Sequence, residues 1–156
     1  MSIAKQIAKH LRDVHFGGNW TTSNYKDHLA DVTWEQAVTP VKGFNNILTL
    51  VFHTHYYVRE VAKVLQGGTL DAKDKYSFEP PAISNQADWE QFLNKVMSDA
   101  EAFAQLIEQL PDSRLDEVFI EEKYGTYFRN LNGIIEHLHY HLGQLVFLKK
   151  MLTLRD

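Results

Sequence analysis

Three histidines near the end of the chain, His137, His139 and His141, have the side chains and the spacing best suited to chemistry. In a helix of about 100° per residue, His137 and His141 lie roughly 40° apart and one turn apart, so their rings can converge on one point. His139 lies about 160° from either partner and is expected to face solvent or a subunit contact. Because neutral imidazole is the commonest metal ligand, the pair indicates a metal site.

The segment that carries these histidines, residues 131–154, has the apolar stripe of a helix that packs on a core. His141 falls inside the stripe and His137 at its border. A buried imidazole must bind something or find hydrogen-bond partners, and this apolar face offers no obvious partners. Metal binding is therefore favoured over plain core histidines. The stripe consists of Leu131, Ile134, Leu138, Leu142, Leu145 and Leu152.

Composition limits the classes of protein to consider. The 156 residues suit one domain, residues 1–156, with a full hydrophobic core. A net charge of -4 without a basic run argues against a nucleic-acid partner. We expect a cytoplasmic protein with no membrane association, because no segment resembles a signal peptide or a membrane span. With no cysteine, a metal site must use nitrogen and oxygen ligands.

Apolar periodicity predicts four long helices, near residues 2–16, 44–65, 86–110 and 129–153. Long connections join them, so we expect an all-α four-helix bundle with long crossover connections, in which metal sites form between facing helices. The first connection contains a capping pattern at 33–36 that predicts one short helical turn. Four residues are expected to pin this connection to the bundle: Trp20, Tyr25, Leu29 and Trp34.

Two points remain open from periodicity alone. The second long helix carries His53 and His55, which fall on opposite edges of its apolar stripe, so the pattern does not choose between them. The weak alternation in residues 117–128 fits a short hairpin and a loop equally well.

These residues resemble the DinB-like (DinB/YfiT) superfamily of metal-dependent enzymes, four-helix bundles with a three-histidine metal site. The fourth-helix pattern of that family is a histidine, three residues, a second histidine, one residue and Gly-Gln, which matches His137, His141 and Gly143-Gln144. The second-helix frame, I-x-x-L-x-x-H, ends here at His53. The stretch HFGGNWT near the start is also similar. The resemblance thus implies His53 as the third ligand, with His55 as the less favoured substitute.

The resemblance also implies an activity. Its members use one divalent ion, nickel, zinc or similar, and transfer or isomerise small molecules, often with a low-molecular-weight thiol as co-substrate; many form homodimers. We therefore expect a thiol-dependent S-transferase or a small-molecule hydrolase or isomerase. The alternative is a non-catalytic, metal-binding, dimeric stress-related protein. No acid–base residue can be assigned from the candidates on the helices that carry the histidines, which are Tyr57, Glu60, Glu136 and Gln144.

Overall fold

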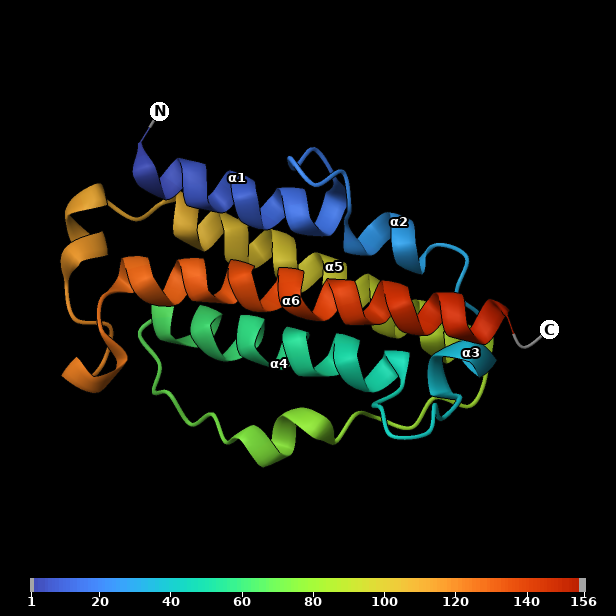
Figure 1. Cartoon of the computed structure of the whole chain (residues 1–156). Coiled ribbons are helices and arrows are strands. Elements are labelled where there is room, and N and C mark those ends of the chain that lie inside the picture. The colour runs from blue at the N-terminus through green and yellow to red at the C-terminus, as the bar shows by residue number, and fades with distance from the viewer. Residues whose placement is uncertain (1, 155–156) are drawn as a thin grey trace.

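The computed structural model describes residues 2–154 and consists of helices and their connections (Figure 1). The four long helices lie side by side, which confirms the predicted all-α architecture. Within 2–154 the only β-type pairs are two isolated bridges, Val41 with Phe44 and Val118 with Thr126. The long helices are α1 (Ile3–Phe16), α4 (Ile47–Leu65), α5 (Gln86–Glu108) and α6 (Tyr127–Thr153).

Helix α6 packs against α4 and α1, and α5 packs against the same two helices from the other side. Buried side chains from all four form one hydrophobic cluster, in which Leu11, Trp89, Phe103 and Leu145 are completely buried. A buried side chain of this kind contributes about 1.5–3 kcal/mol relative to an exposed one. The α4–α6 interface brings together the two helices that carry the candidate ligands.

Polar caps explain where the helices begin. The Asn46 side chain accepts the Thr49 N–H at 2.8 Å, so α4 starts three residues later than predicted. Thr126 accepts the Arg129 N–H at 3.2 Å, so α6 starts two residues earlier. Each cap satisfies a backbone donor that the helix itself leaves unpaired.

The first connection holds two short helices, α2 (Tyr25–Leu29) and α3 (Trp34–Val38). The capping box of Thr33 and Gln36 confirms the predicted turn. Trp34 packs against the core as a half-buried side chain, and Tyr25 and Leu29 of α2 are buried.

Trp20 does not pin this connection, because it is 97% exposed. The Asn19 side chain closes a turn by donating to the Ser23 carbonyl at 2.7 Å and accepting the Ser23 N–H at 3.2 Å. Trp20 lies inside this turn and points away from the bundle.

The other connections contain short 3₁₀ helices. η1 (Asp74–Phe78) lies along α4 and contacts it (Figure 1). η2 (Asp112–Asp116) and η3 (Glu122–Tyr124) precede α6. The alternating segment pairs only at the Val118–Thr126 bridge, so it is a loop closed at its base and not a regular hairpin.

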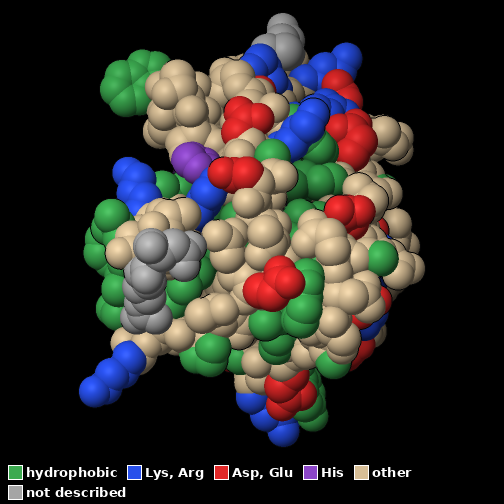
Figure 2. All heavy atoms as spheres, turned by 90° about the vertical axis from the view of Figure 1, so that its right-hand side faces the viewer, with side chains coloured by type: hydrophobic (Ala, Val, Ile, Leu, Met, Phe, Trp, Pro, Cys, Tyr) green, Lys and Arg blue, Asp and Glu red, His purple; other side chains and the backbone are tan. Residues whose placement is uncertain are grey.

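No described helix combines the length and the hydrophobicity that a membrane crossing requires. On the end of the molecule seen in Figure 2, Lys and Arg side chains lie among Asp and Glu side chains and do not gather into one basic patch.

Candidate metal centre

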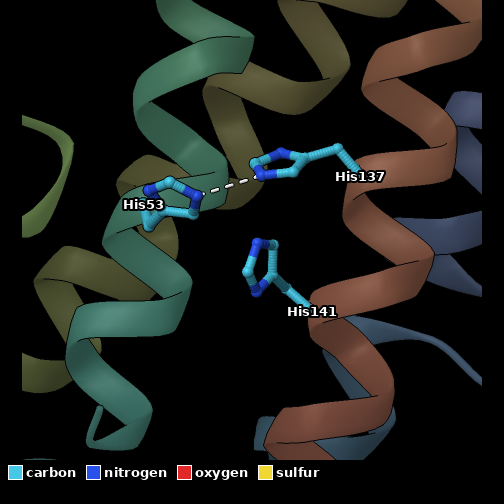
Figure 3. Close-up of side chains that lie close together, drawn as sticks. All are labelled: His53, His137 and His141. Atoms are coloured by element: carbon cyan, nitrogen blue, oxygen red, sulfur yellow. Dashed lines mark hydrogen bonds between the residues drawn. The ribbon is translucent and has the colours of Figure 1, made fainter. Parts of the chain in front are cut away.

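His53 of α4 meets His137 and His141 of α6 at the interface between the two helices (Figure 3). One ring nitrogen from each residue can be chosen so that all three lie within 4.8 Å of one another. The His137 and His141 ring centroids are 4.5 Å apart, as expected for side chains one helical turn apart. His53 is buried, and the two α6 histidines are half-buried.

The structure separates His53 from His55. Both are 5% exposed, so burial does not distinguish them. His55 points toward α5, where its Nε2 lies 3.2 Å from Asp99 Oδ2, whereas the Nε2 of His53 lies 3.0 Å from that of His137. His139 lines a separate cavity with His10 and is not part of the cluster. The structure thus brings together the three histidines that the resemblance selected.

A serine holds the ring of His53. The Ser77 hydroxyl donates its hydrogen to the Asp74 carbonyl at 2.6 Å, so its oxygen must accept a hydrogen from His53 Nδ1, 2.7 Å away. The lone pair of His53 is then on Nε2, which faces the other two histidines. Such a partner fixes both the tautomer and the orientation of a metal-binding imidazole.

A glutamine does the same for His141. The Nδ1 of His141 lies 2.7 Å from Gln144 Oε1. An amide oxygen can only accept a hydrogen bond, so Nδ1 carries the hydrogen and the lone pair of His141 is also on Nε2. The Nε2 atoms of His53 and His137 are 3.0 Å apart. Two nitrogens bound to one tetrahedral ion at about 2.0–2.1 Å are separated by about 3.3–3.4 Å. The His53–His137 pair is thus close to the spacing of two ligands on one ion, and the ligand atoms of all three histidines, which lie within 4.8 Å of one another, would move closer together around it.

Desolvation keeps these imidazoles neutral. It lowers the pKa of His53, His137 and His141. The pKa of His137 falls to about 4, because the two neighbouring histidines add to the effect of burial. A neutral imidazole carries the lone pair that a metal ion needs, so the site does not have to release protons near pH 7.

A cavity of about 570 Å³ opens beside His53 and His137. Tyr57 packs edge-on against both rings, with centroid distances of 5.3 and 5.2 Å. Its hydroxyl donates to Asp74 Oδ1 at 2.6 Å, and burial, followed by Asp74, raises the pKa of the phenol to about 12. Tyr57 therefore keeps its proton at neutral pH. Of the acid–base candidates on these helices, Tyr57, Glu60 and Glu136 line the cavity, whereas Gln144 supports His141.

Sequence reasoning missed several polar residues at this site, among them Ser77, Asp74 and Arg129. Ser77 lies in η1, within a connection that has no apolar period, and Arg129 lies in the first turn of α6 and lines the cavity. No local pattern in the sequence shows that η1 lies against His53.

The model of the DinB superfamily matches residues 19–145. The chain belongs to the DinB superfamily. The matched region contains α4 and all but the last turns of α6, and so includes the three clustered histidines. No curated protein and no solved structure matches the chain. The family match and the histidine cluster together fit a metal-binding helical protein.

Proposed function

We propose that His53, His137 and His141 hold one divalent ion, zinc or nickel, and that this DinB-superfamily protein is a metal-dependent enzyme acting on a small molecule in the adjacent cavity. The observation that carries the proposal is the orientation of the rings. Ser77 and Gln144 occupy the Nδ1 atoms of two histidines and leave their Nε2 lone pairs directed to a common point. An Nδ1 partner that leaves Nε2 free is typical of metal-binding histidines, and the meeting of three imidazole rings is more than a satisfied core histidine needs.

Three protein ligands suit a catalytic site, which keeps a position open for water or substrate. Two of the three, His53 and His137, also line the cavity. When bound, a divalent ion supplies Lewis acidity and lowers the pKa of a water or thiol beside it. Tyr57 packs against the rings of His53 and His137, and its protonated hydroxyl holds Asp74 at the cavity wall.

We further propose that one reactant is a low-molecular-weight thiol. The chain has no cysteine, so a nucleophilic sulfur must come from outside the protein. A thiol whose pKa is lowered at the site would be a thiolate at neutral pH, which is the reactive form. The proposed reaction is transfer of the thiol sulfur to a small electrophile bound in the cavity. Hydrolysis or isomerisation of a small molecule is the alternative reaction for the same site.

The test is the near-ultraviolet and visible spectrum of the cobalt-substituted protein at neutral pH. Titration with glutathione should give a sulfur-to-cobalt charge-transfer band, and S-methylglutathione, which cannot form a thiolate, should not. The His139→Ala variant should behave as the wild type, because His139 lies in another cavity. A cobalt spectrum that no thiol or small anion changes would mean a closed coordination sphere, and the non-catalytic metal-binding alternative would replace the enzyme.

A further inference from the structure

One wall of the cavity beside the histidines is a segment that the proposed metal chemistry does not use. Residues 69–79, the strap, include η1 and run along α4 (Figure 1). Leu70, Ala72 and Asp74 of the strap line the cavity. We propose that the strap opens and closes this cavity, and that an ion bound by the histidines holds it closed through His53. The proposal rests on the proposed function, because it requires the ion.

Few buried apolar contacts hold the strap on the bundle. Ser77 is its only buried residue. Leu70 is half-buried against the core, and the two aromatic residues, Tyr76 and Phe78, are exposed. A segment with so little buried apolar surface opens at a low cost in free energy. We therefore expect the strap to open locally while the helices around it stay folded.

Polar contacts with α4 hold the strap in place. The Tyr56 hydroxyl accepts the Lys73 N–H at 2.9 Å, and the Tyr57 hydroxyl donates to Asp74 Oδ1 at 2.6 Å. Each such bond makes a modest net contribution, because water can replace either partner when the strap opens. An ion pair with Lys63 adds little, because both of its side chains are exposed. The strap is thus held by a small number of separate contacts, which single substitutions can remove.

A further contact belongs to a metal ligand. His53 donates its Nδ1 hydrogen to the Ser77 hydroxyl at 2.7 Å, and its ring stacks on that of Phe78 at a centroid distance of 4.2 Å. Both of these partners lie in the strap, whereas the Nε2 of His53 faces His137. The strap and a bound ion therefore use opposite nitrogens of one imidazole ring.

The two nitrogens of this ring are coupled. A cation on Nε2 withdraws electron density from the ring, so the Nδ1–H becomes a charge-assisted donor, and such hydrogen bonds are about twice as strong as neutral ones. The Ser77 contact is then stronger with the ion bound than without it. Because coupling between two sites is reciprocal, the closed strap also raises the affinity for the ion. The loaded protein thus keeps its cavity wall closed, and the wall opens more often when the ion is lost.

The experiment measures hydrogen exchange of the strap in the zinc-saturated protein and in the apo protein prepared with a chelator, at pH 7.5. The reporters are the amides of Tyr76 and Glu79, which donate to carbonyls within the strap. Zinc should slow their exchange about three- to tenfold, as expected when a neutral hydrogen bond becomes charge-assisted. The helix η2, which has the same length and packs against α1 and α6, should exchange equally in both samples.

Two variants separate the coupling from simple loosening of the strap. Tyr56→Phe and Ser77→Ala each remove one hydrogen bond, so each should speed strap exchange in the apo protein. Tyr56→Phe leaves the His53–Ser77 contact intact and should keep the zinc effect at its wild-type size. Ser77→Ala should lose the zinc effect at a zinc concentration that fills the site. Equal exchange of the wild type with and without zinc, a full zinc effect in Ser77→Ala, or its loss in Tyr56→Phe would each overturn the proposal.

Metal content of the same samples separates this proposal from the proposed function. A wild type that binds one zinc ion without slower strap exchange refutes the coupling and leaves the proposed metal site in place. A wild type that binds neither zinc nor nickel refutes the proposed function, and the coupling with it. His141→Ala keeps the His53–Ser77 contact but should lose the ion, so zinc should not slow its strap exchange. A full zinc effect in this variant would also overturn the coupling.

Discussion

Removal of the Ser77 hydroxyl tests whether support of the His53 ring matters for metal binding. In the wild type this hydroxyl accepts the His53 Nδ1 hydrogen at 2.7 Å and donates to the Asp74 carbonyl at 2.6 Å. Ser77 is completely buried, so water cannot easily replace the lost group. Ser77→Ala therefore leaves the ring free to turn and to change tautomer, while the three histidines remain.

The size of the effect follows from the role of that hydrogen bond. Loss of a partner that orients a metal-binding histidine typically weakens metal affinity about 10- to 100-fold. We expect the same range here, which corresponds to about 1.4–2.8 kcal/mol of binding free energy. The binding stoichiometry should remain one ion per chain, because no ligand is removed.

The assay is competition for zinc with a chromophoric chelator at pH 7.5. Ser84→Ala is the matched control: it lies in the same connection, its hydrogen bond to Asp88 comes from the backbone N–H, and it is exposed. Its affinity should equal that of the wild type. A Ser77→Ala variant that binds zinc within twofold of the wild type would refute the assigned role of the Ser77–His53 hydrogen bond.

Two further predictions concern stability. Burial lowers the pKa of His15 to about 4 in the folded protein, against 6.5 when unfolded, so the unfolded chain binds more protons and stability falls as pH drops below 6.5. At pH 5, His15 lowers the free energy of unfolding by about 2 kcal/mol. His15→Phe should remove this part of the pH dependence when the free energy is measured by urea unfolding. If the free energy of unfolding changes between pH 5 and 7 as much in the variant as in the wild type, the prediction is wrong. Asn46→Ala should lower the free energy of unfolding by about 0.5–2 kcal/mol, because the α4 cap is lost. Asn45→Ala, at an exposed neighbour, should change it by less than about 0.5 kcal/mol. Equal effects of the two substitutions would rule out the role of the cap.

The sequence predicted the four long helices because their apolar residues recur with the helical period over many turns. It also predicted that His137 and His141 would point to one place, because a spacing of four residues defines one helix face. The helix starts were less accurate where the capping residue, such as Asn46, lay inside a segment with no strong period. Residues 19–23 were also predicted poorly. The size of Trp20 suggested burial, but Trp20 lies in the turn that the Asn19 side chain closes, and it is exposed.

The third histidine could not be chosen from periodicity, because His53 and His55 lie at similar angles from the middle of the apolar stripe. The choice depends on which helix packs on each edge: α6 lies on the His53 edge, and α5, with Asp99, lies on the His55 edge. Only the resemblance to a family carried this information in the sequence. The contact between Ser77 and His53 depends on how η1 lies along α4, which no local pattern encodes.

The central claim is that three histidines hold one divalent ion, and elemental analysis of protein purified without an affinity tag tests it most directly. We expect near one zinc or nickel ion per chain in the wild type, loss of that ion in His141→Ala and in His53→Ala, and full retention in His139→Ala and His55→Ala. Absence of a divalent ion from the wild type after incubation with zinc and nickel, or equal loss in His139→Ala and His141→Ala, would contradict the claim.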